Sequence, residues 1–268
     1  MRWDMLVAMG ERLDNARNLY LEGIRDGDAE TAIAKYIGDR YTQHSTPVKD
    51  GKDGFIEFFA DFVRRNPVRD IEIVRGFEDG RYVFLHAVQT LNNGEYRYVT
   101  ADIFDTDDDA KMIEHWDMIA ELTDESVSGH SQVDGPAEPT DLHMTDQNKA
   151  LVAAFIDDVL STGDFDKLAD YVSNETFIQH NPLIGDGIDG LTTFVEQLAA
   201  DGTAMVYEQT YKIIGSGSFV VALSRAELGG APIAVIDLFR VDDGRIVEHW
   251  DVIEEITPEE TWVNSGKF

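Results

Sequence analysis

Residues 113–122 read IEHWDMIAEL, and residues 247–256 read VEHWDVIEEI. Six of the ten positions are identical, including the run Glu-His-Trp-Asp. A second pair of segments repeats upstream, with YTQHSTPVKDGKDGFIEFF at 41–59 and FIQHNPLIGDGIDGLTTFV at 177–195. The two Gln-His dipeptides are 136 residues apart, and the two Glu-His-Trp-Asp runs are 134 apart. Self-similarity at one nearly constant spacing indicates a tandem duplication.

The repeat predicts the domain organisation. We expect one domain over residues 1–124 and a second over 145–268, each of ordinary domain size. The segment between them, residues 125–144, is polar, contains glycine and proline, and has no apolar period, so it is expected to be a linker. Because the copies are similar, we also expect them to associate within the chain as an intramolecular pseudo-dimer.

Each copy shows the same order of expected elements. Apolar residues at helical spacing come first, then a second short helix, then a third helix after the Gln-His segment, with Asp53 and Asp189 as candidate N-caps. The remainder alternates as four strands, which in the first copy fall at about 70–78, 81–90, 94–105 and 111–121. Three helices followed by a curved antiparallel sheet predict an α+β unit with a pocket between the layers.

Composition limits the possible partners and chemistry. The net charge is −30, from 52 acidic and 22 basic residues. Such a surface repels nucleic acid and anionic membranes, so we expect neither as a partner. The chain has no cysteine, which excludes disulfides, zinc–thiolate sites and thiol nucleophiles. The N-terminal residues are too acidic for a secretory signal, and no apolar run is long enough to span a membrane, so a cytoplasmic location is expected.

The repeated Glu-His-Trp-Asp run carries candidate chemistry. Alternate side chains of a strand share a face, so His115 and Asp117 lie on one face and Trp116 on the other. On the preceding strand, Asp102 shares its face with largely apolar residues. A carboxyl group in such surroundings is costly unless it is paired or its pKa is raised, which suits a proton carrier. The candidate catalytic residues of both copies are His44, Asp102, His115, Asp117, His180, Asp237, His249 and Asp251.

Each candidate also has a purely structural interpretation. A His–Asp pair on a sheet is often a surface ion pair, and Trp116 and Trp250 could simply fill the core. His44 and His180, next to proline-containing turns, could satisfy turn backbone. A zinc or iron site from His44 with the His115–Asp117 pair lacks a ligand spacing, so no metal is expected.

The motifs together resemble the SnoaL-like polyketide cyclase family, within the NTF2-like and ketosteroid-isomerase-like superfamily. The resemblance rests on Gln-His-Asn-Pro, the downstream Asp-Gly and the later GRIVEHWDV. It implies two tandem cone-shaped α+β barrels with apolar pockets, and a cofactor-independent aldol condensation in which an Asp or His removes a proton next to a carbonyl. Further candidates for ligand binding are Gln43, His86, Trp116, Gln179, Asn181 and Trp250.

The chain departs from the family pattern at two places. The first copy reads Ser45-Thr46-Pro47 where the second reads Asn181-Pro182, and Ala120 and Glu254 stand nearest to the family's acid/base aspartate. Two functions therefore remain open. One is acid/base chemistry, aldol-type or isomerising, on a small apolar carbonyl compound; the other is a non-catalytic module that binds a small molecule.

Overall fold

The computed structural model describes residues 10–268, which form two compact units. Unit 1 contains the chain up to Tyr96, Asp102–Asp117 and the C-terminal Thr257–Phe268; unit 2 contains Arg97–Ala101 and Met118–Ile256. Each predicted domain is one continuous stretch of the chain, whereas each of these units also includes a short segment from the other half of the sequence. Residues 1–9, which entered the argument against a secretory signal, lie outside the described residues. Among the described helices, none is both long and apolar enough to cross a membrane.

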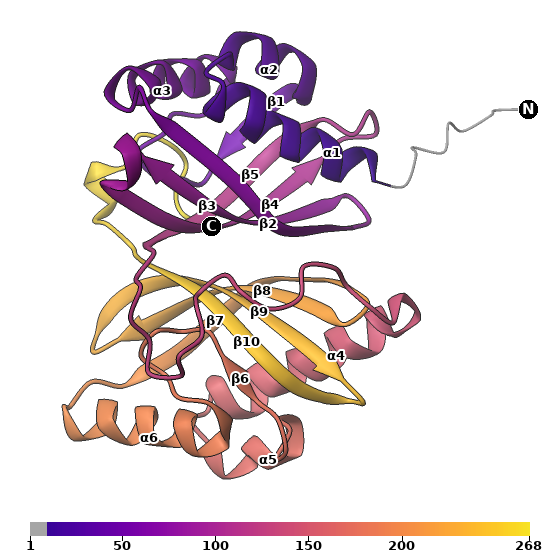
Figure 1. Ribbon diagram of the computed structural model, residues 1–268, viewed down its shortest axis with the longest axis vertical. Helices are drawn as coiled ribbons and strands as arrows, with labels where there is room; N and C mark the ends of the chain where they lie inside the picture. Colours follow the sequence, from indigo (N-terminus) through magenta and orange to yellow (C-terminus); the bar gives the residue numbers. More distant parts are fainter. Residues whose placement is uncertain (1–9) are drawn as a thin grey trace, which may run out of the picture. The chain divides into compact units, whose positions relative to one another are not determined.

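From residue 10 on, the first copy contains three α-helices and five strands (Figure 1). Helix α1 continues into a π-helical segment, and a 3-10 turn links β3 to β4. The bounds are α1 Glu11–Asn18, π-helix Leu19–Arg25, α2 Ala29–Tyr36, β1 Ile37–Gln43, α3 Gly51–Arg65, β2 Arg69–Asp79, β3 Tyr82–Leu91, 3-10 helix Asn92–Gly94, β4 Tyr96–Thr106 and β5 Met112–Glu121.

The second copy repeats this order. Its first helix also ends in a π-helical segment, and 3-10 turns precede α4 and α5 and follow β10. The bounds are 3-10 helix Leu142–Met144, α4 Thr145–Phe155, π-helix Ile156–Leu160, 3-10 helix Phe165–Lys167, α5 Leu168–Tyr171, β6 Ile178–Gln179, α6 Gly187–Ala200, β7 Met205–Ser216, β8 Phe219–Leu228, β9 Ala231–Asp242, β10 Arg245–Glu255 and 3-10 helix Glu259–Thr261.

The sheets confirm the predicted α+β class and add one strand to each copy. Their orders are β1-β5-β4-β3-β2 and β6-β10-β9-β8-β7. Neighbours β7 to β10 pair antiparallel, as do β2 and β3, whereas β1 pairs parallel with β5 and β6 parallel with β10. The short strands β1 and β6 were missed because the first is polar and the second has only two residues. The sheets are therefore mixed, not purely antiparallel.

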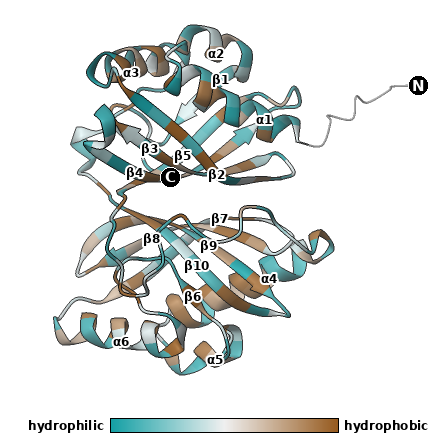
Figure 2. Ribbon diagram, in the orientation of Figure 1, coloured by the Kyte–Doolittle hydropathy of each residue, from teal (hydrophilic) through white to brown (hydrophobic). Residues whose placement is uncertain are grey.

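In each copy, apolar residues of the helices pack against apolar residues of the sheet. Hydrophobic and hydrophilic residues both occur along β2 (Figure 2), where the exposed Glu72 follows the buried Ile71, whereas Arg75 and Phe77 are both buried. Leu19 and Ile24 from the helical layer pack in one apolar cluster with Leu85 of β3 and Phe104 of β4. In the second copy Phe155 and Val159 pack in the same way with Phe239 of β9. Each unit therefore has its apolar core between helices and sheet.

The repeated Asp-Gly-x-Asp-Gly segment starts the third helix of each copy. The helix begins at Gly51 and at Gly187, both with positive φ, so the predicted N-caps Asp53 and Asp189 lie one turn too late. The preceding Asp50 instead accepts a hydrogen bond from the backbone N–H of Gln43 at 2.7 Å, as Asp186 does from Gln179 at 2.8 Å. This bond fixes the Gln-His segment against the helix start.

Candidate active site

The two repeated motifs form one site because their strands are neighbours. In β1, Gln43 lies opposite His115 of β5, and in β6, Gln179 lies opposite His249 of β10. The side chains meet as well: His115 Nδ1 lies 2.8 Å from Gln43 Oε1, and His249 Nδ1 lies 3.0 Å from Gln179 Oε1. The predicted ligand-binding glutamines therefore hold the imidazole rings.

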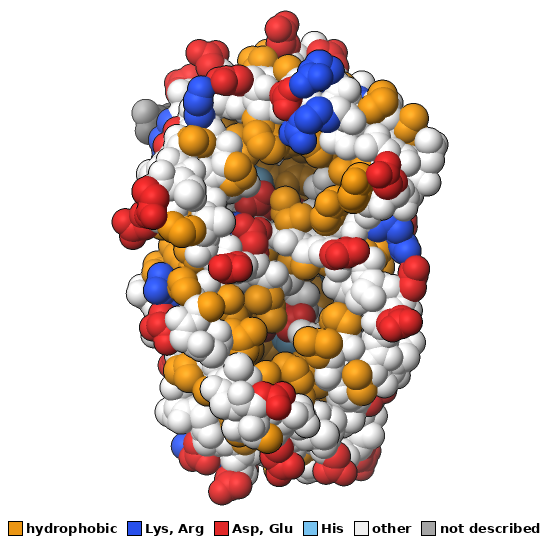
Figure 3. Space-filling model, turned by 90° about the vertical axis from the view of Figure 1, so that its left-hand side faces the viewer, with side chains coloured by type: hydrophobic (Ala, Val, Ile, Leu, Met, Phe, Trp, Pro, Cys, Tyr) orange, Lys and Arg blue, Asp and Glu red, His pale blue; other side chains and the backbone are white. Residues whose placement is uncertain are grey.

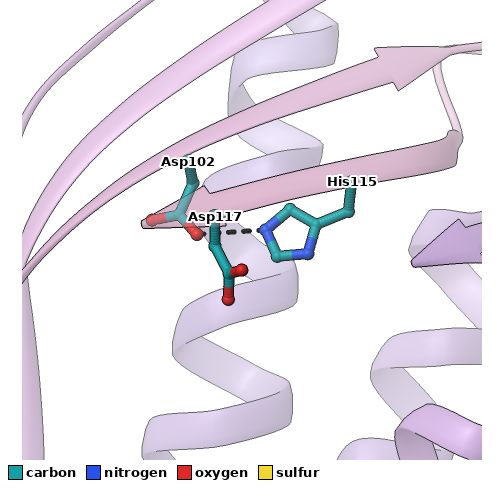
Figure 4. Close-up of side chains that lie close together, drawn as sticks. All are labelled: Asp102, His115 and Asp117. Carbon is teal, nitrogen blue, oxygen red and sulfur yellow. Dashed lines mark hydrogen bonds and ion pairs between the residues drawn. The ribbon is translucent and has the colours of Figure 1, made fainter. Parts of the chain in front are cut away.

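In unit 1 two carboxylates lie beside the imidazole. His115 Nε2 is 3.0 Å from Asp102 Oδ1, and the hydroxyl of Tyr20 donates to the same oxygen. Asp117 follows on the same face of β5, and Figure 4 shows both carboxylates beside the same end of the His115 ring. Asp102 is 0% exposed and Asp117 is 6% exposed. Among the described residues, no hydrogen-bond partner is found for Asp117 Oδ1.

Hydrogen bonds determine where the His115 protons lie. Gln43 Oε1 accepts from the backbone N–H groups of His44 at 3.1 Å and Ser45 at 3.2 Å, so this atom is the amide oxygen. Nδ1 of His115 must therefore donate to it. Consequently one proton is shared between Nε2 and Asp102, either as an imidazolium–carboxylate pair or as two neutral groups. The ring of Phe104 stacks on the imidazole at 4.4 Å between centroids, which keeps water from this face.

Unit 2 has the same arrangement. His249 Nε2 lies 3.0 Å from Asp237 Oδ1, and Phe239 stacks on the ring at 4.9 Å. The hydroxyl of Tyr207 lies 3.1 Å from each oxygen of Asp237. Tyr207 comes from strand β7, whereas Tyr20 comes from the π-helical segment after α1. The two copies thus supply the same hydroxyl from different elements, and neither tyrosine was among the residues predicted for the site.

The charges in unit 2 favour a protonatable carboxyl group. Burial raises the pKa of Asp251, and the nearby Asp237 adds to this effect, whereas His249 and the Asn181 amide oppose it. Burial alone would lower the pKa of His249, but the hydrogen bond to Asp237 and the charge of Asp251 outweigh burial and raise it. His249 is therefore held as a cation to higher pH than free histidine, beside a carboxyl group that keeps its proton to higher pH than free aspartate.

Tyrosine hydroxyls near both clusters stay neutral. Burial, followed by the charge of Asp102, raises the pKa of Tyr20 well above the usual value, and burial with the charge of Asp237 does the same for Tyr207. Burial and the charge of Asp117 likewise raise the pKa of Tyr41. These hydroxyls therefore do not act as bases at neutral pH, and those of Tyr20 and Tyr207 donate hydrogen bonds to Asp102 and Asp237.

An apolar cavity of about 280 Å³ opens onto the unit 2 cluster. Its wall comes from α6, β7 and the turns before β6. Figure 3 shows hydrophobic side chains around hollows in the surface, with acidic and histidine side chains at the bottom. The size is near the lower end for small-molecule sites. The polar and charged lining residues include Gln179, Asn181, Tyr207, Asp237, His249 and Asp251, and the apolar ones include Phe155, Phe177, Leu191, Phe194, Leu198 and Ile253.

The other half of each Glu-His-Trp-Asp run lies on the opposite face of the sheet. Trp116 stacks on His44 at 4.7 Å and Trp250 stacks on His180 at 4.5 Å, with the rings nearly parallel. His180 Nε2 also lies 2.9 Å from Glu248 Oε1. The structure therefore does not bring His44 and His180 together with the carboxylates of the site. It places them with Trp116 and Trp250 in packed pairs behind the sheet.

His86 also lies apart from the cluster. It alternates along β3 with Leu85 and Ala87, which pack in the core beneath the helices, so its side chain is on the other face. Its Nδ1 lies 2.9 Å from the guanidinium of Arg75, which is 2% exposed. Of the predicted residues, the structure brings together Gln43, Asp102, His115 and Asp117 in unit 1, and Gln179, Asn181, Asp237, His249 and Asp251 in unit 2.

The same residues have the donor types of a divalent-cation site. Each unit contains one group of three such residues, and within a group the possible ligand atoms, one from each residue, all lie within 4.8 Å of one another. The groups are Asp102, His115 and Asp117 in unit 1, and Asp237, His249 and Asp251 in unit 2. In each group, however, the imidazole nitrogen already lies at hydrogen-bond distance from an aspartate, 3.0 Å. In each group the imidazole and this aspartate therefore form a hydrogen-bonded pair.

The chain is therefore an α+β protein with two similar units, each with helices on one face of a mixed five-stranded sheet and an imidazole–carboxylate pair on that face. Within this class the chain belongs to the SnoaL-like family: the SnoaL-like domain matches residues 17–115 and again 152–249. The resemblance inferred from the motifs is confirmed. None of the curated proteins matches the chain significantly.

Solved structures of similar proteins each match part of the chain. A candidate polyketide cyclase from Bacillus cereus is 20% identical over 41% of this chain and 74% of its own, with a TM-score of 0.37. A candidate ketosteroid isomerase from Kribbella flavida is 14% identical over 43% and 83%, also at 0.37. An NTF2-like protein of unknown function from Burkholderia xenovorans is 14% identical over 43% and 89%, at 0.35.

Proposed function

We propose that the chain catalyses cofactor-independent acid/base chemistry, aldol-type cyclisation or isomerisation, on a small apolar carbonyl compound. The observation that carries the proposal is Asp251, a carboxyl group with a raised pKa that faces an apolar cavity beside a hydrogen-bonded imidazole. A carboxyl group in such surroundings exchanges protons near neutral pH more readily than a free aspartate does. Asp117 has the corresponding role in unit 1.

The residues around Asp251 have separate roles. The carboxylate removes a proton from the carbon next to the carbonyl, and the C–H electron pair moves into an enolate. The proton then returns to another carbon in an isomerisation. In an aldol step the enolate carbon instead attacks a second carbonyl, whose oxygen takes the proton. Both nitrogens of His249 are occupied by Gln179 and Asp237, so the ring contributes fixed positive charge and does not itself transfer the proton.

The test uses 2-tetralone, a bicyclic apolar ketone with an acidic C–H next to its carbonyl. The wild-type chain is expected to accelerate exchange of that proton with D2O, followed by NMR, with saturation at high ketone concentration. Saturable binding without faster exchange would contradict the enzyme and support the second candidate, a binding module. One observation favours that candidate: His249 and Asp251 are already hydrogen-bonded by protein groups.

The pH dependence follows from the pKa of Asp251. With Asp117 replaced by Asn, only unit 2 contributes, and the base must be ionised to act. The exchange rate should therefore be low in acid and rise with pH through the pKa of Asp251, which burial has raised, so the rise falls above the range of a free aspartate. A rise at or below the ordinary aspartate range would contradict Asp251 as the base.

A further inference from the structure

The C-terminal residues form part of unit 1, although they follow the last strand of the second copy. The backbone N–H of Val263 donates to the carbonyl of Thr46 at 3.1 Å, and the carbonyl of Gly266 accepts from His44 Nδ1 at 2.6 Å. The Asn264 amide donates to the carbonyls of Ser45, at 2.6 Å, and of Val48, at 2.9 Å. The segment is therefore bound along the turn that follows Gln43.

The segment after β5 makes the corresponding contacts in unit 2. The backbone N–H of Val127 donates to the carbonyl of Pro182 at 3.0 Å, and Ser131 accepts from His180 Nδ1 at 2.7 Å. Val127 and Ser131 precede their C-terminal counterparts by 136 and 135 residues, the spacing of the repeat. Since the contacts recur in register, these segments are part of the repeated unit and each holds its last residues close to a site.

One position beside the site carries a different residue in the two segments, lysine at 267 and glutamine at 132. Lys267 is 2% exposed, its Nζ donates to the backbone carbonyl of Asp117 at 2.9 Å, and it lies 3.7 Å from Asp117 Oδ1. The corresponding residue in unit 2 is Gln132, whose amide lies 3.4 Å from the carbonyl of Glu121. Only the C-terminal segment therefore brings a cation to the site aspartate.

The site aspartate of unit 2 has another partner. The Asn181 amide nitrogen lies 3.0 and 2.7 Å from the two oxygens of Asp251. The corresponding residue of unit 1 is Ser45, whose side chain has no amide group. A buried carboxylate that loses its hydrogen-bond donor is costly unless a charge compensates for it, and an ammonium group 3.7 Å away does so.

We propose that Lys267 is the positioning residue for Asp117, in the role that Asn181 has for Asp251, so that the C-terminus of the chain completes the unit 1 site. This inference rests on the proposed function, because Asp117, which Lys267 positions, is the proton carrier of that reaction. The two sites are then unequal: one holds its carboxylate with a cation, the other with a neutral amide.

The test uses the full chain with Asp251 replaced by Asn, so that only unit 1 exchanges the 2-tetralone proton. Lys267→Met is expected to lower kcat by about tenfold or more, because the carboxylate loses its opposite charge, and to leave KM within about twofold, because Lys267 does not contact the ketone. Lys267→Arg should restore most of the rate. The matched control is Lys49→Met, which removes an exposed ammonium in the same background and should change neither constant.

The outcomes separate the two proposals. If Lys267→Met leaves kcat unchanged while loss of both aspartates abolishes exchange, the proposed function stands and the role of Lys267 is overturned. If the wild type does not accelerate exchange at all, 15N NMR of the lysine ammonium groups decides. The Lys267 ammonium should exchange with water more slowly than that of Lys49, and Asp117→Asn should speed it severalfold. No change on that substitution would refute the Lys267–Asp117 pair.

Discussion

Replacing Asp117 and Asp251 together by Asn is expected to lower the rate of 2-tetralone proton exchange at least about 100-fold, the lower range for loss of a general base. An amide has nearly the same shape as the carboxylate but cannot take the proton. In unit 2 the fold should tolerate the change. Burial raises the pKa of Asp251 in the folded chain above its value in the unfolded chain. The free energy of unfolding therefore falls as the pH rises from the unfolded pKa to the folded pKa, because the folded chain holds the ionised group less favourably. A neutral amide avoids that cost at pH 7.

The control for this double variant is Asp39→Asn with Asp166→Asn, which removes two exposed carboxylates and the same charge. It should keep the wild-type rate. Each single variant, Asp117→Asn or Asp251→Asn, should keep only the contribution of the other unit, so the singles also measure how the activity divides between the sites. A double variant with the full exchange rate would show that these aspartates are not the proton carriers.

Much of the fold could be predicted because the chain contains it twice. The repeat in register located the copies, and strand alternation separated His115 and Asp117 from Trp116, as the structure has them. The same rule was not applied to Gln43 and His44, because β1 was not recognised as a strand. In a strand, neighbouring side chains face opposite ways. Gln43 therefore reaches the imidazole, whereas His44 reaches Trp116 behind the sheet.

The rest of the site could not be found by comparing the copies. Tyr20 and Tyr207 reach equivalent aspartates from a helix and from a strand, so no shared position points to them. Lys267 lies in a segment whose counterpart was interpreted as a linker. The two segments share few residues because the contacts that recur use backbone atoms of the segment, namely the N–H of Val263 or Val127 and the carbonyl of Gly266 or Ser131, which place little restriction on side-chain identity. Sequence comparison detects repeated side chains, and here the repeated feature is backbone contact.

Trp250→Ala should cost about 3–5 kcal/mol in the free energy of unfolding, the usual range for removing a buried tryptophan. Trp250 is 1% exposed, stacks on His180 at 4.5 Å, and donates its indole N–H to the carbonyl of Asp134 at 3.0 Å. The substitution leaves a cavity and an unsatisfied carbonyl. Calorimetry of the full chain should show the loss in the transition of unit 2.

The matched control is Trp250→Phe, which keeps an aromatic ring against His180 and loses only the indole N–H and part of the volume. It should cost clearly less than the alanine variant. Trp250 lies on the face of β10 opposite His249. Neither variant should therefore weaken the binding of 2-tetralone by the folded protein. Weaker binding by Trp250→Phe at unchanged stability would instead make Trp250 a ligand-binding residue, the role that its place in the repeated motif first indicated.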